Sequence, residues 1–137
     1  MSKNNKTAII TGSNRGLGLE LLQTLSSNGY NIIACSRSKS SSFSKIIDEV
    51  SKKNNNKIFN LNFDLLNKED TEKTLTEFLN NYENSIDLLI NNAGILKNSL
   101  LLMTPSKEVE EIFRVNVFSV ILISQIVAKK MIKNKSG

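Results

Sequence analysis

The stretch Thr11-Gly12-Ser13-Asn14-Arg15-Gly16-Leu17-Gly18 decides how the rest of this sequence is interpreted. It follows an apolar run, 8–10, and opens a segment, 17–25, in which leucines recur at helical spacing. The sequence therefore predicts a strand, a glycine-rich turn and a helix. Glycines let a backbone approach a ligand closely, and a helix N-terminus favours an anion. We interpret the turn as a phosphate-binding site; taken alone, it could equally be a plain strand-to-helix turn.

The composition of the 137-residue chain indicates one globular domain. Apolar residues make up 39% and charged residues 23%, so we do not expect disorder. The polar start, 1–6, lacks the apolar core of a secretory signal. The longest apolar stretch, 115–128, is interrupted by polar residues and too short to span a bilayer. A single cysteine, Cys35, excludes an internal disulfide and fits a reducing compartment, so we expect a cytoplasmic protein with no membrane partner.

Two further classes of partner are disfavoured by residue type. The chain has no histidine and one cysteine, so a zinc or haem site would have almost no ligands, and we expect no metal. A net charge of +5 leaves nucleic-acid binding open in principle. However, the lysines of 52–57 and 129–135 fall where helices are predicted to end, where the macrodipole favours cations, and no aromatic residues interleave with them. We therefore expect no nucleic-acid partner.

Strands and helices are predicted to alternate along the whole chain. Apolar runs predict strands over 7–11, 30–35, 57–63 and 86–90. Helical periodicity predicts helices from 16 to the Asn28-Gly29 pair, around 43–50, from a capping arrangement at 67–70 to 82, and over 105–133, with Thr104 as N-cap and Pro105 as first helical residue. This alternation implies βαβ units and a doubly wound parallel α/β sheet. Such sheets bind ligands at the carboxyl ends of their strands.

Four motifs at these positions resemble the short-chain dehydrogenase/reductase family. The glycine spacing is not G-x-G-x-x-G but matches that family's T-G-x-x-x-G-x-G, and Asn91-Asn92-Ala93-Gly94 matches its N-N-A-G element. Asp64 matches the acidic residue that holds the adenine in the family, and Asn116 matches the asparagine of its catalytic tetrad. The resemblance implies a single Rossmann-type NAD(P)-binding domain over 1–137. Among subfamilies, the chain resembles the 3-oxoacyl-carrier-protein reductases.

The resemblance also implies the residues of the site. Asn116 is the expected catalytic residue, which orders a water in the proton relay and interrupts its helix. Taken alone, Asp64 could be a helix cap, the 91–94 element a strand-terminating turn, and Asn116 a surface asparagine. The expected cofactor-binding residues follow the four strands and are Gly12, Ser13, Asn14, Arg15, Gly16, Leu17, Gly18, Ser36, Arg37, Asp64, Leu65, Asn91, Ala93 and Gly94.

The end of the second predicted strand favours NADP(H) as the cofactor. NAD sites usually place an Asp or Glu there, about 20 residues past the glycine turn, whereas NADP sites place an arginine. Here the sequence is Cys35-Ser36-Arg37, without a carboxylate. Arg37 and Ser36 can hydrogen-bond a 2′-phosphate, and Arg15 can reach the same group. Either arginine alone could be a solvated surface charge, but two that converge on one phosphate favour a role in binding.

The residues that transfer the proton in this family are not found in the sequence. The family uses a Y-x-x-x-K pair and an upstream serine, but Tyr30 is followed four residues later by Ala34 and Tyr82 by Ile86. We expect the N-terminal portion of a reductase that interconverts a carbonyl and a secondary alcohol, truncated after the fourth strand and the long helix, incomplete at the C-terminus and inactive alone. The apolar helix predicts a homo-oligomer, dimer or tetramer, when complete. A non-catalytic NADP(H)-binding or dimerisation module is the alternative.

Overall fold

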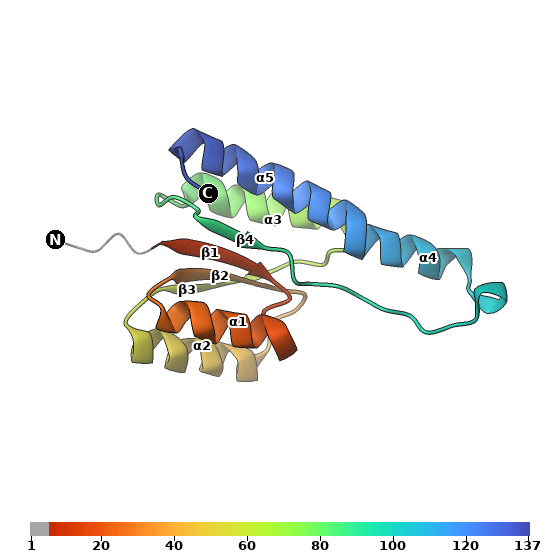
Figure 1. Cartoon of the computed structure of the whole chain (residues 1–137), viewed down its shortest axis with the longest axis horizontal. Helices are drawn as coiled ribbons and strands as arrows, with labels where there is room; N and C mark the ends of the chain where they lie inside the picture. The colour runs from red at the N-terminus through yellow and green to blue at the C-terminus, as the bar shows by residue number, and fades with distance from the viewer. Residues whose placement is uncertain (1–5) are drawn as a thin grey trace.

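A four-stranded parallel sheet lies between two layers of helices in the computed structural model, which describes residues 6–137 (Figure 1). The strand order is β3-β2-β1-β4, so the connection from β3 to β4 returns past the first strand and reverses the direction of winding. This arrangement confirms the predicted Rossmann-type doubly wound sheet. The strands are β1 Thr7–Thr11, β2 Asn31–Ser36, β3 Ile58–Asn62 and β4 Leu88–Ile90.

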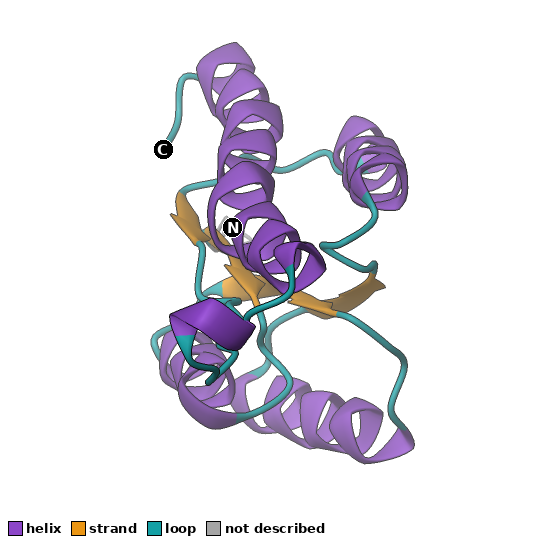
Figure 2. Ribbon diagram, turned by 90° about the vertical axis from the view of Figure 1, so that its right-hand side faces the viewer, coloured by secondary structure: helices purple, strands orange, loops and turns teal. Residues whose placement is uncertain are grey.

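The helices are divided between the two faces of this sheet. Helices α1 and α2 lie on one side of it, and α3 and α5 lie on the other (Figures 1 and 2). The last of them continues a helical stretch that begins with α4 and passes through a π-helical segment, η2. The bounds are α1 Gly16–Ser27, α2 Ser41–Asn54, α3 Lys68–Asn81, the 3-10 helix η1 Leu101–Met103, α4 Ser106–Phe113, η2 Arg114–Phe118 and α5 Ser119–Asn134.

The central strands alternate their side chains between two hydrophobic clusters. All five residues of β1 and all six of β2 are buried, as their continuous apolar runs predict. Ile10 and Ala34 pack with Leu22 of α1 and Phe43 of α2. Their neighbours Ile9 and Ile33 face the opposite cluster. That second cluster contains Leu75 and Leu79 of α3 and Ile123 and Val127 of α5.

Local capping signals fix the ends of two helices as predicted. Gly29, with φ +85°, ends α1. Its amide donates to the Ser26 carbonyl at 3.0 Å, and the Tyr30 amide donates to the Leu25 carbonyl at 3.1 Å, which is the Schellman pattern. At the start of α3, the Asn67 side chain accepts a hydrogen bond from the backbone of Asp70 at 3.1 Å.

Two predicted boundaries were wrong. The N-cap of α4 is Pro105 rather than Thr104. The Thr104 hydroxyl instead donates to the Leu100 carbonyl at 2.9 Å and lies 2.8 Å from the Ser99 hydroxyl, so it is bonded to the segment that precedes α4. Strand β4 is also shorter than the predicted 86–90, because the Thr7 amide donates to the Asp87 carboxylate at 2.7 Å and a side chain replaces a backbone acceptor.

The helical stretch Ser106–Asn134 is longer than the apolar run 115–128 that it contains. Among the described residues, this continuous helical stretch could, by length and composition alone, cross a membrane. A core helix of a globular protein passes the same test. Here Ile123 and Val127 are buried against the sheet, while Phe113, Phe118 and Ile121 are at least half exposed, at 51%, 58% and 51%.

Candidate functional site

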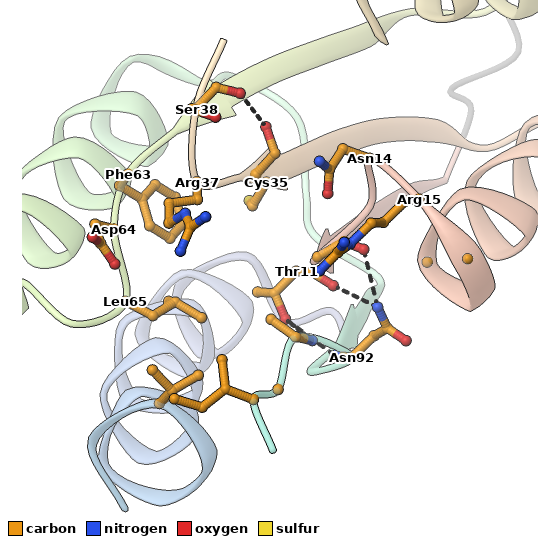
Figure 3. A pocket seen from close by; sticks show the side chains of 18 of the residues that line it. Thr11, Asn14, Arg15, Cys35, Arg37, Ser38, Phe63, Asp64, Leu65 and Asn92 are labelled. Atoms are coloured by element: carbon orange, nitrogen blue, oxygen red, sulfur yellow. Dashed lines mark hydrogen bonds between the residues drawn. The ribbon is translucent and has the colours of Figure 1, made fainter. Parts of the chain in front are cut away.

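A pocket of about 540 Å³ opens where the carboxyl ends of the four strands meet (Figure 3). Strand β1 lies between β2 and β4, so this is the point where the sheet changes its direction of winding. Loops after every strand contribute to the wall, and η2 adds one residue. The lining residues are Thr11, Gly12, Asn14, Arg15, Gly16, Leu17, Gly18, Cys35, Ser36, Arg37, Ser38, Phe63, Asp64, Leu65, Leu66, Asn92, Ala93, Gly94, Ile95 and Val115.

The three glycines of the first turn differ in the space that surrounds them. Gly12 has φ +68°, and a Cβ there would lie 2.9 Å from Ala93 Cα. A Cβ on Gly18 would overlap the Gly12 carbonyl and lie 2.6 Å from the Asn92 side chain. Gly16 has φ +53° but faces open space. Gly12 and Gly18 therefore let the turn pack, while Gly16 leaves room beside the first turn of α1.

Asn92 joins the loops that follow β1 and β4. Its side-chain amide donates to the carbonyls of Thr11 at 3.0 Å and Gly12 at 3.1 Å. In return, the Thr11 hydroxyl accepts from the backbone amides of Asn92 at 3.1 Å and Ala93 at 3.0 Å. These four bonds make the two loops one unit. Asn92 was not among the predicted site residues, although it belongs to the N-N-A-G element.

Both predicted phosphate-binding arginines lie on the pocket wall. Arg15 precedes α1 and Arg37 follows β2, and both side chains are exposed and line the pocket (Figure 3). Neither forms an ion pair with another described residue. Ser36 is largely buried, and its hydroxyl accepts a hydrogen bond from the Asn62 amide at 2.8 Å. The pocket thus carries two guanidinium groups that can pair with an anion.

Ser13 and Cys35 lie beneath the glycine turn. Ser13 does not line the pocket: it is fully buried, and its backbone amide and its hydroxyl both donate to the Cys35 carbonyl at 3.2 Å. The Cys35 thiol contributes to the lining but is only 2% exposed. Burial raises the pKa of this thiol from 9.0 to about 12, since removal from water disfavours the thiolate.

Asp64 and Leu65 line the pocket after β3, together with the unpredicted Phe63 and Leu66. One carboxylate oxygen of Asp64 accepts the backbone amide of Leu66 at 3.0 Å. The Asp64 amide donates to the Asp70 carboxylate at 3.2 Å. The aspartate therefore shapes the start of α3 and faces the pocket as well, so both interpretations of this residue describe part of its surroundings.

Asn91 and Asn116 are not part of the lining. The Asn91 amide donates to the Ser124 hydroxyl of α5 at 3.2 Å. The Asn116 side chain pairs with the backbone of Ile95 through two bonds: it accepts from the amide at 2.9 Å and donates to the carbonyl at 2.8 Å. Asn116 lies in η2, so the helix is interrupted around it, and its side chain connects η2 to the loop after β4.

The remaining unpredicted lining residues are of two kinds. Thr11, Cys35 and Ser38 flank predicted residues in the sequence and could have been found by extending each strand end. Ile95 and Val115 come from separate segments that meet only in the folded chain. Within the described residues, no group of three or more His, Cys, Asp or Glu side chains could hold a metal ion.

The sheet order and the glycine-rich turn define a Rossmann-type nucleotide-binding protein. Comparison with protein families makes this more specific. A family model described as short chain dehydrogenase matches residues 6–137. The chain belongs to this family of oxidoreductases.

Similar proteins support the assignment. The chain is 36% identical, over all of its 137 residues, to 54% of a 3-oxoacyl-[acyl-carrier-protein] reductase from Buchnera aphidicola (strain Bp). It is 32% identical over 132 residues to the reductase of the same name from Aquifex aeolicus, covering 96% of this chain and 52% of the relative. The chain therefore spans about half the length of the curated relatives it matches.

Solved structures show the same fold. A 3-oxoacyl-[acyl-carrier protein] reductase from Brucella melitensis superposes with a TM-score of 0.82 and 26% identity, covering 96% of this chain and 52% of the other. A short-chain dehydrogenase from Sphingobium yanoikuyae superposes with a TM-score of 0.84 over 96% of this chain and 50% of the other. Its sequence identity is 20%, so this match concerns the fold alone.

Proposed function

We propose that this chain is the NADP(H)-binding part of a cytoplasmic oxidoreductase that interconverts a carbonyl and a secondary alcohol. Its family, and relatives named as 3-oxoacyl-[acyl-carrier-protein] reductases, favour a 3-oxoacyl thioester as the substrate. The Sphingobium protein is described in complex with NADPH, and the Brucella reductase in complex with NAD. These complexes support a nicotinamide cofactor, and the preference for its phosphorylated form is our own proposal.

The first turn and α1 would hold the pyrophosphate. The open space beside Gly16 lies at the N-terminus of α1, where unpaired backbone amides and the helix dipole favour an anion. Asn14, Leu17 and Gly18 line the same part of the pocket. Ser13 would act from below by fixing the turn to the Cys35 carbonyl. The residues present therefore fit the pyrophosphate of a dinucleotide.

The observation that carries the proposal is the charge at the end of β2. Arg37 and Arg15 both line the pocket, and the β2 end has no carboxylate that would repel a 2′-phosphate. Ser36 is the last residue of β2, directly before Arg37, and it lines the same pocket. Guanidinium groups bind phosphate through charge-assisted hydrogen bonds. We assign Arg37, Arg15 and Ser36 to the 2′-phosphate of NADP(H).

The other lining residues would hold the two ends of the cofactor. Asp64 and Leu65 are assigned to the adenine, and Ala93 and Gly94 to the ribose and nicotinamide end, where small side chains leave room. Asn91 would support this loop from α5 through Ser124. When bound, the nicotinamide supplies or accepts a hydride.

Asn116 is assigned to the proton relay. Its side chain is already fixed by two bonds to the Ile95 backbone, and Ile95 lines the pocket. An amide held in this way can place a water molecule through its remaining hydrogen-bonding capacity. The proton transfer itself needs an acid that this segment does not supply.

Cofactor binding tests the proposal directly. NADPH and NADH affinities can be measured by titration calorimetry for the wild type and for Arg37→Ala. We expect Arg37→Ala to weaken NADPH binding about tenfold to a hundredfold, because a charge-assisted hydrogen bond is lost, while NADH binding changes little. Lys39→Ala is the matched control, since Lys39 is exposed nearby but does not line the pocket. An unchanged ratio of the two affinities would remove Arg37 from the site.

A second candidate function is a non-catalytic NADP(H)-binding or dimerisation module. Tyr82 favours it, because this tyrosine is 8% exposed and its hydroxyl is hydrogen-bonded at 2.9 Å to the Thr7 hydroxyl. Thr7 begins β1, whereas the pocket lies at the other end of that strand. We expect residues 1–137 alone to bind NADPH without reducing a 3-oxoacyl thioester. Steady turnover by this chain would show that another group acts as the acid. A Y-x-x-x-K pair in a longer transcript would favour the reductase over the module.

The oligomeric state is a further part of the proposal. The exposed apolar residues of α4 to α5 favour association into a homo-oligomer, dimer or tetramer, in the complete protein. Light scattering of the chain as given, with and without NADPH, would show whether this helix associates alone.

A further inference from the structure

Asn62, the last residue of β3, does not line the pocket, but its side chain is hydrogen-bonded to Ser36, which does. Its side-chain amide donates to the Ser36 hydroxyl at 2.8 Å and to the Asn60 side-chain oxygen at 3.4 Å. Ser36 and Asn62 are register partners at the ends of β2 and β3, and the Phe63 amide donates to the Ser36 carbonyl at 3.1 Å. The side chain of Asn62 therefore sets the surroundings of Ser36 directly.

The direction of this hydrogen bond determines what Ser36 can do. A serine hydroxyl has one proton to donate and two lone pairs that accept. Because Asn62 donates to the Ser36 oxygen, the Ser36 proton must point elsewhere, and its contact is the Ser38 carbonyl at 3.4 Å. That distance marks a weak bond. Ser36 is thus held as a donor whose proton can be given to a better acceptor at the pocket wall.

A phosphate group is such an acceptor. Its oxygens accept strong hydrogen bonds, whereas a ribose hydroxyl both donates and accepts. An aspartate in place of Asn62 could only accept, so it would bind the Ser36 proton and turn it away from the pocket. The amide of Asn62 is therefore suited to a neighbour that must donate to an anion.

We infer that Asn62 is a positioning residue for the 2′-phosphate of NADP(H), acting through the Ser36 hydroxyl. This inference rests on the proposed function and adds a determinant of cofactor specificity outside the pocket lining. Asn62 touches Ser36 rather than the cofactor, so its effect depends on the presence of the Ser36 hydroxyl.

The test is a double-mutant cycle on cofactor affinity. We expect Asn62→Ala to weaken NADPH binding about three- to tenfold, the usual effect of one lost hydrogen bond, and to leave NADH binding nearly unchanged. In a Ser36→Ala background, Asn62→Ala should have no further effect on NADPH. Equal losses for both cofactors, or additive losses in the double variant, would overturn the inference.

Two further variants guard against a purely structural effect. Asn62→Asp keeps the shape of the side chain, so it serves if Asn62→Ala fails to fold. We expect it to weaken NADPH binding at least about tenfold, because it takes the Ser36 proton and adds a negative charge. Asn60→Ala is the matched control: Asn60 lies two residues earlier on β3 and accepts a long hydrogen bond of 3.4 Å from Asn62. This variant should leave both affinities unchanged.

Failure of the inference and failure of the proposed function give different results. If the wild type does not prefer NADPH and Arg37→Ala changes nothing, the proposed function fails and the role of Asn62 fails with it. If Arg37→Ala removes the preference while both Asn62 variants keep it, only the role of Asn62 is wrong. Thermal unfolding of each variant shows whether the folded state is retained.

Discussion

The loops that follow β1 and β4 start at the same end of the sheet but are stabilised in different ways. The first is short, and its carbonyls at Thr11 and Gly12 are bound by the Asn92 side chain. The second runs through η1 to α4 and exposes four consecutive apolar side chains at 100–103, between 73% and 99%. Ion pairs near the surface join Lys97 of this second loop to Glu111 at 3.1 Å and to Glu108 at 4.0 Å, both in α4.

This difference predicts where substitutions matter. The first loop depends on close-packed backbone contacts at Gly12 and Gly18, where an added atom has no room. The second depends on exposed contacts, and exposed ion pairs contribute little to stability. Residues around the glycine turn, with Asn92 and Ala93, should therefore be sensitive to substitution, and residues 97–103 of the second loop tolerant.

The reactivity of Cys35 gives the largest expected contrast. Burial raises its pKa from 9.0 to about 12, so the thiolate fraction at pH 8 should be about a thousandfold lower than in the unfolded chain. Labelling by a thiol reagent should be correspondingly slow in the native protein and fast in urea. Ser99→Cys in a Cys35→Ala background places a thiol in the exposed second loop and should react at the unfolded rate. Rapid native labelling of Cys35 would show that the glycine turn opens.

The same pKa shift makes stability depend on pH. The folded state keeps the Cys35 proton that the unfolded state loses above pH 9.0, so the contribution is present below pH 9.0 and is lost as pH rises towards 12. The unfolding free energy of the wild type should fall more steeply over this range than that of Cys35→Ala. Parallel curves for the two proteins would contradict the shift.

Gly18→Ala should destabilise the protein by about 3 kcal/mol or more and abolish cofactor binding, because its Cβ would overlap the Gly12 carbonyl. Gly16→Ala is the matched control, since only the cost of φ +53° applies there and space is open. We expect it to cost about 1 kcal/mol. Urea unfolding measures both values, and equal costs would mean that the turn is not close-packed.

Thr11→Val should cost about 2 kcal/mol, since the amides of Asn92 and Ala93 lose their common acceptor. Thr11→Ser keeps the hydroxyl and should cost less than half as much. Comparison of the two variants by thermal unfolding separates the loss of the hydrogen bonds from the loss of volume. A valine variant as stable as the serine variant would show that the two loops are not joined through this hydroxyl.

Leu102→Ser should have the smallest effect, within about 0.5 kcal/mol, because Leu102 is 99% exposed in the second loop. Leu22→Ser is the contrasting variant, since Leu22 is a fully buried residue of α1 and the substitution should unfold the protein or nearly so. A large cost for Leu102→Ser would indicate that the second loop is covered in solution.

Local sequence signals predicted most of the sheet and of the first loop. The glycine spacing, the buried strands and the Asn28-Gly29 helix end each depend on residues close in sequence, so they could be recognised without the fold. The positions of Arg15 and Arg37 in one pocket followed from the rule that parallel strands end at the same edge. Their roles in binding remain predictions.

The features that escaped prediction depend on contacts between distant segments. Asn92 is important because its amide meets Gly12, 80 residues earlier, and nothing in its neighbouring sequence separates it from Asn91. The π-helical turn around Asn116 was expected only as an interruption, and its pairing with Ile95 could not be predicted from either segment. Thr104 is not the cap of α4, because its hydroxyl is bonded to Leu100 and Ser99 in the loop before the helix.

The contacts of Asn92 also affect the order in which the site can form during folding. The Asn92 amide reaches Thr11 and Gly12 across sequence separations of 81 and 80 residues. Closing such a long loop is slow compared with forming the neighbouring β1–α1–β2 segment. The glycine turn can therefore begin to form early, but its back wall is completed only when β4 joins the sheet. Cofactor binding during refolding would thus report the arrival of β4, and should lag behind the formation of helix.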